Sequence, residues 1–221
     1  MSSVELVTLV VDDVEVQVPK GLGLVETAAA AGIEIPVFCY EPRIGPPVGA
    51  CRMCLVDVEG QGKLQAGCTL TAQDGMVVRT AQTSEKAADG QNATLEFILV
   101  NHPLDCPVCD KGGECPLQDF SYSFGPNESR MGFPRRVFDG EGVKADVDFG
   151  PTLMLNRNRC ILCTRCVRFM DDVHQEPVLC VSERGDRATI SKAADADLTQ
   201  PWAANVIDLC PVGALVSKDF L

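Results

Sequence analysis

The stretch Asn158-Arg-Cys-Ile-Leu-Cys-Thr-Arg-Cys-Val-Arg168 places three cysteines at successive two-residue gaps, and Cys210-Pro211 follows further along the chain. Such a run is typical of a 4Fe-4S cluster, because the thiolates converge on separate corners of a cube. In two-cluster ferredoxins the cysteine before proline ligates the other cluster. This segment has only one run, so the last cysteine most simply completes the same cube. The predicted ligands, which we call the third group, are Cys160, Cys163, Cys166 and Cys210.

A second group lies upstream, in the run Asn101-His-Pro-Leu-Asp-Cys-Pro-Val-Cys-Asp-Lys-Gly-Gly-Glu-Cys-Pro116. A lone histidine is usually structural, but this one stands three residues before a C-x2-C pair. A neutral imidazole in place of a thiolate lowers the negative charge on a cluster and alters its potential. We predict a second 4Fe-4S site here, although the same donor set is also known for zinc. The predicted ligands are His102, Cys106, Cys109 and Cys115.

The first group consists of four cysteines and no histidine, spaced Cys-x11-Cys-x2-Cys-x13-Cys. Plant-type 2Fe-2S ferredoxins bind their cluster with a long loop whose backbone N–H groups point at the sulfurs. Gly45 and Gly49 suit such a loop, although its first gap of 11 residues departs from the plant-type gap of four. We predict a related 2Fe-2S site. Its ligands are Cys39, Cys51, Cys54 and Cys68.

Other cysteine chemistries fit less well. The chain has 12 cysteines, and an even number in a secreted protein would favour disulfides. However, the N-terminus lacks a basic region followed by an apolar one, and the cysteines are bunched at two-residue gaps. The twelfth cysteine, Cys180, lies in an apolar run and is predicted to be a buried core residue. We expect His174 at the surface, and we assign neither residue as a ligand.

The net charge and apolar content of the chain indicate which class of partner it binds. The formal net charge is -12, so nucleic acid is excluded as a partner and other proteins are favoured. No uncharged apolar stretch approaches the roughly 18 residues needed to span a bilayer. The sequence therefore predicts a soluble protein in a reducing compartment, without insertion into a membrane.

Four arginines surround the third group in sequence, namely Arg157, Arg159, Arg165 and Arg168. We favour a solvated basic face for them. The alternative is positive charge that tunes the cluster or docks a partner.

The order of the predicted elements indicates an α+β protein made of small cofactor domains. We expect an N-terminal 2Fe-2S ferredoxin-like β-grasp domain (residues 1–82), a connector helix with a 4Fe-4S domain ligated by one histidine and three cysteines (83–150), and a 4Fe-4S ferredoxin-like domain (151–221). Strands are predicted at 4–11, 14–18, 54–58 and 76–79, with a turn at Asp12-Asp13. Helices are predicted at 24–31, 83–100, 163–172 and 203–209, with a possible break at Asp89-Gly90. Residues 112–150 are expected to form a cluster-organised loop.

With these motifs the sequence resembles the N-terminal part of the large iron-sulfur subunit of bacterial NADH:quinone oxidoreductase, respiratory complex I, called the G subunit or the 75 kDa subunit. The resemblance covers all 221 residues. The motifs that carry it are Cys51-Arg-Met-Cys54, the 101–116 run, the 158–168 stretch and Cys210-Pro-Val-Gly-Ala-Leu215. It implies a 2Fe-2S cluster on the first group and a 4Fe-4S cluster on each of the others. The family usually continues into a domain resembling molybdopterin oxidoreductases, whereas this chain stops at Leu221.

The resemblance implies an electron-relay subunit that passes single electrons from a flavin-bearing NADH-binding subunit toward quinone. Its implied partners are that subunit and the later iron-sulfur subunits of the peripheral arm. Its implied place is the cytoplasmic side, peripheral to the inner (plasma) membrane, within an enzyme that is a translocase. The sequence contains neither G-x-G-x-x-G after a strand nor G-x4-G-K-[ST], so NADH and flavin are expected to bind elsewhere.

Two other functions remain open. The equivalent subunit of an NAD-linked hydrogenase or formate dehydrogenase resembles the same cluster layout. A structural metal-bound module, with zinc or clusters and no redox duty, belongs to a different class. Iron-only hydrogenases look similar at their N-terminus but would need a second C-x2-C-x2-C run and a catalytic cluster domain.

Overall fold

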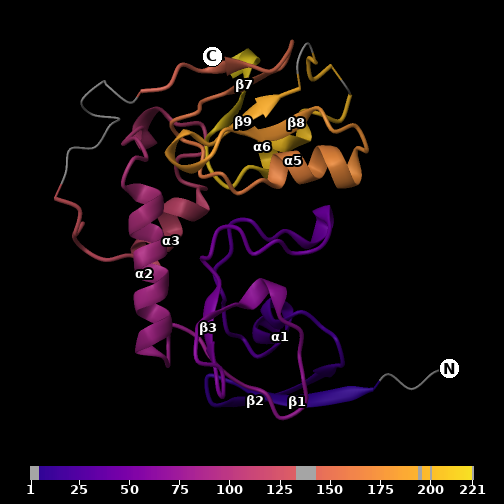
Figure 1. The fold of residues 1–221 in the computed structure, drawn as a ribbon, viewed down its shortest axis with the longest axis vertical. Helices are drawn as coiled ribbons and strands as arrows, with labels where there is room; N and C mark the ends of the chain where they lie inside the picture. The colour runs from indigo at the N-terminus through magenta and orange to yellow at the C-terminus, as the bar shows by residue number, and fades with distance from the viewer. Residues whose placement is uncertain (1–4, 133–142, 194–195, 200, 221) are drawn as a thin grey trace. The chain divides into compact units, whose positions relative to one another are not determined.

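The computed structural model describes residues 5–132, 143–193, 196–199 and 201–220. The chain divides into two compact units by its internal contacts. The first unit comprises Met1–Tyr40, Pro47–Leu95 and Phe124–Pro126. The second comprises Glu41–Pro46, Glu96–Ser123 and Asn127–Leu221. Helices and strands are both present in each unit, as the α+β prediction requires (Figure 1).

The first unit is built on a five-stranded mixed sheet in the order β2-β1-β5-β3-β4. Its strands are β1 (Leu6–Val11), β2 (Val14–Pro19), β3 (Leu55–Val58), β4 (Gln65–Ala66) and β5 (Val77–Arg79). β1 and β2 form an antiparallel hairpin, while β1 pairs in parallel with β5. Asp12 and Asp13 both have positive φ (48° and 66°), as a two-residue hairpin turn of the type I′ class requires. The predicted first strand began at residue 4, which lies outside the described residues.

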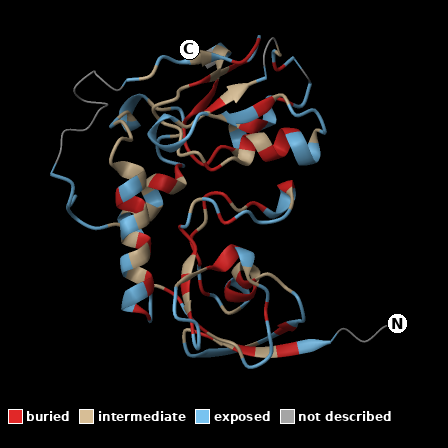
Figure 2. Cartoon of the chain, viewed as in Figure 1, coloured by how far each residue is buried: buried red, intermediate tan, exposed pale blue. Residues whose placement is uncertain are grey.

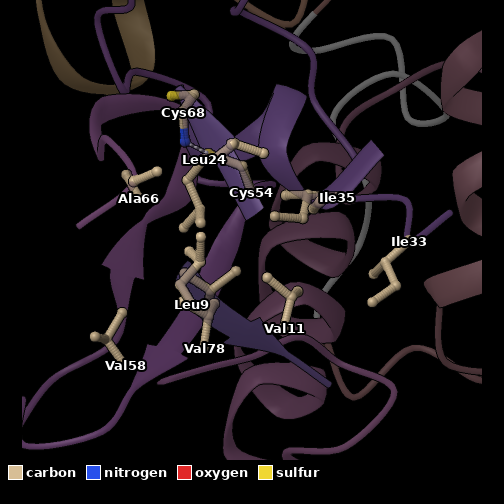
Figure 3. Close-up of a cluster of buried hydrophobic side chains, with 14 of the residues drawn as sticks. Leu9, Val11, Leu24, Ile33, Ile35, Cys54, Val58, Ala66, Cys68 and Val78 are labelled. Carbon is tan, nitrogen blue, oxygen red and sulfur yellow. Dashed lines mark hydrogen bonds between the residues drawn. The ribbon is translucent and has the colours of Figure 1, made fainter. Parts of the chain in front are cut away.

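Side chains that alternate along β1 form the core of this unit. Val7, Leu9 and Val11 are buried, whereas their neighbours face outward to varying degrees (Figure 2). Val7, Leu9 and Val11 pack with Leu24 from helix α1 (Leu24–Ala30). The same buried cluster includes two candidate ligands, Cys54 and Cys68, which Figure 3 shows among the apolar side chains. Burial of each large aliphatic side chain contributes about 1.5–3 kcal/mol.

Helix α2 (Glu85–Leu99) is continuous, so the break predicted at Asp89-Gly90 does not occur. Ala87 and Leu95 are buried along it. A Cβ on Gly90 would come within 2.7 Å of Leu64 Cδ1. Glycine therefore permits close packing at this position, which offsets its low helix propensity.

The second unit contains two small sheets and short helices. Strands β6 (Val147–Asp148), β7 (Leu153–Leu155) and β10 (Leu215–Ser217) form one antiparallel sheet in the order β10-β7-β6, and β8 (Leu179–Ser182) pairs with β9 (Thr189–Lys192). The helices are α3 (Pro116–Phe124), α5 (Arg165–Arg168) and α6 (Asn205–Leu209). α5 continues as a π-helix over Phe169–Val173. Short 3-10 helices of this unit span Pro42–Ile44, Cys106–Val108, Gly185–Arg187 and Lys218–Phe220, and another spans Gly67–Thr69 in the first unit.

Two predictions about this region are wrong. Helix α3 occupies part of residues 112–150, where a loop was expected. Proline suits the first helical position, and Leu117, Phe120 and Phe124 follow with helical spacing, a signal that the glycine-rich surroundings obscured. Cys180 is exposed on β8, not buried, because it points to the opposite face from buried Leu179. Residues 133–142 of the expected loop lie outside the described residues.

His174 also departs from its expected place at the surface, because its side chain is only 14% exposed. Across the described residues, we found no helix with both the length and the apolar character needed to cross a membrane.

Candidate functional site

The four cysteines of the first group converge in the first unit, and backbone N–H groups point at their sulfurs. The N–H of Cys39 donates to Cys51 Sγ at 3.4 Å, and the N–H of Cys51 donates back to Cys39 Sγ at 3.5 Å. Cys68 N–H donates to Cys54 Sγ at 3.5 Å (Figure 3). Arg52 has a φ of 61°, a left-handed conformation within the C-x2-C turn. This is the pattern of backbone support expected around the sulfurs of an iron-sulfur cluster.

The sulfurs of this group are close enough to share protons. Hydrogen bonds from the thiols of Cys51 and Cys68 lower the pKa of Cys39, and one from Cys68 lowers the pKa of Cys54. The same contacts raise the pKa of Cys51 and of Cys68. Deprotonating all four thiols would therefore require positive charge between them, and bound iron supplies such charge.

All four residues of the second group line one cavity of about 330 Å³ in the second unit. The Nε2 atom of His102 is buried and has no hydrogen-bond partner among the described residues. Its Nδ1 lies 3.0 Å from the Pro103 carbonyl, which fixes the tautomer with the proton on Nδ1. Burial lowers the pKa of His102, which favours the neutral form of the ring. A neutral imidazole with a free Nε2 lone pair fits a metal ligand.

The three cysteines around His102 differ in exposure. Cys106 is exposed, Cys109 is half-buried, and Cys115 is buried with its pKa raised by that burial. The segment between them turns tightly, because a Cβ on Gly112 would lie 2.7 Å from the Cys106 carbonyl oxygen. Glycine at this position lets the ligand loop close.

The four thiols of the third group line a single narrow cavity in the second unit, of about 10 Å³, with mainly apolar walls. Leu162 and Thr164 have φ of 55° and 63°, so the backbone between the cysteines adopts the left-handed conformation twice. Leu162 N–H donates to Cys160 Sγ at 3.4 Å. Burial raises the pKa of Cys160 to about 11 and of Cys163 to about 12, and holds the pKa of Cys166 well above its ordinary value.

Residues that lie far apart in the sequence thus come together at each of the three places. Among the described residues, no three His, Cys, Asp or Glu side chains are grouped as they would be around a single metal ion. A cluster is larger than one ion and takes its ligands at separate corners. The orphaned Nε2, the shared protons and the thiol-lined cavities fit such clusters as cofactors.

The expected solvated basic face is wrong for three of the four arginines. Arg168 is buried and donates to the Pro46 carbonyl at 2.7 Å. The side chains of Arg159 and Arg165 are only 12% and 13% exposed. Arg159 pairs with Asp105, a residue that sequence reasoning did not single out. The sequence shows that Asp105 stands next to Cys106, but it does not show that Asp105 pairs with Arg159.

Three family descriptions match successive parts of the chain. The 2Fe-2S iron-sulfur cluster binding domain matches residues 4–83, and the NADH-ubiquinone oxidoreductase-G iron-sulfur binding region matches residues 91–130. The ferredoxin-like domain of NADH-quinone oxidoreductase subunit 3 matches residues 150–216. The chain therefore contains 2Fe-2S and 4Fe-4S binding domains, in the order that the ligand groups predicted.

Curated relatives agree over nearly the whole chain. The G subunit of NADH-quinone oxidoreductase from Mycobacterium bovis is 46% identical over 98% of this chain and 26% of its own length. The 78 kDa subunit of mitochondrial NADH-ubiquinone oxidoreductase from Candida albicans is 42% identical over 97% of this chain and 29% of its own length. The chain matches part of the G subunit of NADH-quinone oxidoreductase. It spans about a quarter of the length of the curated bacterial relatives that it matches.

A solved structure extends the likeness to another complex. This chain is 31% identical to a chain in the crystal structure of an NAD+-reducing NiFe-hydrogenase in the H2-reduced state, with a TM-score of 0.80. The match covers 96% of this chain and 87% of that chain.

Proposed function

We propose that this chain is an electron-relay subunit of NADH:quinone oxidoreductase, with one 2Fe-2S cluster and two 4Fe-4S clusters. The observation that carries the proposal is that each predicted ligand group converges on one place, including Cys210 beside the distant 160–166 run. Iron-sulfur clusters supply one-electron chemistry when bound. The proposed domains are residues 1–82, 83–150 and 151–221, one for each group.

The residues around the three sites would bind and shield the clusters. Thiolates would supply 11 of the 12 ligands and His102 Nε2 the remaining one. Backbone N–H groups such as that of Leu162 would stabilise negative charge on the sulfurs. The apolar walls of the third site, including Leu155 and Ile190, would exclude water.

The proposed partners are other subunits of the same complex. NADH and flavin would be bound by a flavin-bearing partner subunit, and later iron-sulfur subunits of the peripheral arm would receive the electrons. The negative charge of the chain argues against nucleic acid. The proposed location is the cytoplasmic side, peripheral to the inner (plasma) membrane within the complex.

A second candidate is the equivalent electron-transfer subunit of an NAD-linked hydrogenase. The likeness to a solved hydrogenase chain over 96% of this chain favours it. The two candidates share the relay chemistry and differ in the partner that supplies or receives electrons.

The relay function is tested by anaerobic reduction of the purified chain. NADH alone should leave the clusters oxidised, and NADH with the flavin-bearing partner of NADH:quinone oxidoreductase should reduce them, as read by low-temperature EPR. Oxidation of NADH by the isolated chain with a flavin of its own would contradict the proposal. Reduction by H2 through a hydrogenase partner, and not through the NADH-binding partner, would favour the second candidate.

His102→Cys should preserve the second cluster while changing its potential. A thiolate replaces a neutral imidazole and adds negative charge, so charge alone predicts a lower midpoint potential. Redox titration followed by EPR measures the shift, and His102→Ala should instead lose the cluster. Equal iron content and an unchanged potential in both variants would show that His102 is no ligand.

Removal of iron should unfold part of the chain. Cluster binding is coupled to folding, and the buried thiols of the third group would lose the cofactor that they surround. An iron chelator under reducing conditions should reduce the circular dichroism signal and open protease sites in residues 151–221. Unchanged spectra and proteolysis after full iron loss would contradict this prediction.

A further inference from the structure

Arg159 connects the second and third ligand groups within the second unit. It directly precedes Cys160, and its Nε donates to Asp105 Oδ2 at 2.9 Å. Asp105 in turn directly precedes Cys106. The Arg159 Nη1 also donates to the Gly213 carbonyl at 3.5 Å. The Arg159 side chain is only 12% exposed, so its guanidinium is largely withdrawn from water, while the Asp105 side chain is 36% exposed.

The segment after Cys210 forms a second connection between the same groups. Cys115 Sγ lies 3.8 Å from the Pro211 carbonyl oxygen. A Cβ on Gly213 would lie 2.1 Å from Cys109 Sγ, so the backbone there is in direct contact with that thiol. Val212, between these residues, lines the cavities of both groups. The segment after Cys210 therefore forms a wall common to both sites, and the Arg159 side chain contacts this segment at the Gly213 carbonyl.

We propose that Arg159 is a positioning residue shared by the two 4Fe-4S sites, which holds their ligand loops together and stabilises the added negative charge of either reduced cluster. The inference rests on the proposed function, since it requires a cluster at each site. A guanidinium withdrawn from water interacts more strongly with nearby charge than an exposed one. Its loss would also leave the Asp105 carboxylate without its partner, which adds to the effect.

The test is a redox titration of Arg159→Gln in the anaerobically purified chain, followed by low-temperature EPR. At a fixed potential, the ratio of reduced to oxidised cluster should fall about tenfold at both 4Fe-4S sites, as expected for loss of one partly buried charge. This change corresponds to midpoint potentials lowered by about 59 mV for a one-electron couple. Retention of the 2Fe-2S signal reports that the chain remains folded.

Two further variants test whether a shift in potential comes from the lost charge or from a general disturbance of the structure. Arg159→Gln combined with Asp105→Asn removes both members of the pair and should bring both potentials back toward wild type. Arg187→Gln removes an exposed arginine and should shift neither potential. If Arg159→Gln lowers the iron content, Arg159→Lys retains the charge and should keep both potentials near wild type.

Several results would overturn the inference. Unshifted potentials in Arg159→Gln, or a shift at one 4Fe-4S site alone, would show that the residue is not shared. Shifted potentials in Arg159→Lys would show that charge is not its contribution. If the wild-type chain shows no reducible 4Fe-4S signal, the proposed function fails together with this inference. If the wild-type signals are normal and the potentials of Arg159→Gln are unshifted, only the role of Arg159 is overturned.

Discussion

Cys163→Ser should leave the chain with about six irons in place of about ten, because the third group loses a ligand and cannot hold its cluster. A serine hydroxyl is a harder and weaker ligand for iron-sulfur clusters than a thiolate. Cys163 is buried among the apolar walls of the third cavity, so water has little room to replace the lost ligand. Iron and acid-labile sulfide analysis measures the loss, and the EPR signal of one 4Fe-4S cluster should disappear.

Cys180→Ser is the matched control for this experiment. Cys180 is the one cysteine outside the three groups, and it is exposed on β8. Its replacement should leave iron content and EPR signals unchanged. If Cys163→Ser retained all its iron, or Cys180→Ser lost a cluster, the ligand assignment would be wrong.

Gly213→Ala should disrupt the second site although Gly213 is not a ligand. The added Cβ would meet Cys109 Sγ at 2.1 Å, far inside van der Waals contact, so the thiol or the backbone must move. Such overpacking typically costs about 1–3 kcal/mol of stability. We expect a loss of about four irons per chain, with the 2Fe-2S signal intact.

The control for this variant is Gly62→Ala, since a Cβ on Gly62 would contact nothing within 4 Å. It should keep the full iron content and the wild-type unfolding temperature. Full iron content in Gly213→Ala, together with wild-type potentials, would contradict the close approach of Cys109.

Local patterns in the sequence predicted most of the first unit. The Asp12-Asp13 turn, the alternating β1 strand and the helix at 24–31 are short-range features, and the structure confirms them within a residue or two at most ends. The convergence of the ligand groups was also predictable, because spacing of cysteines reflects the geometry of the cofactor. Ligation itself stays a prediction until metal is measured.

Features that depend on tertiary contacts were not predictable. The continuity of α2 through Gly90 depends on the side chain of Leu64, which approaches from elsewhere in the fold. Nothing in the sequence around Arg159 indicated that its ion-pair partner would be Asp105. The exposure of Cys180 depended on which face of β8 is buried, and an apolar run alone does not reveal the face.

The proposed function requires that the three ligand groups hold one 2Fe-2S and two 4Fe-4S clusters and that these clusters carry electrons. The most direct test is iron, zinc and acid-labile sulfide per chain in anaerobically purified protein, with low-temperature EPR before and after dithionite. We expect about ten irons, with one 2Fe-2S signal and up to two 4Fe-4S signals in the reduced sample. Stoichiometric zinc, or clusters that never reduce, would contradict it and indicate a structural metalloprotein.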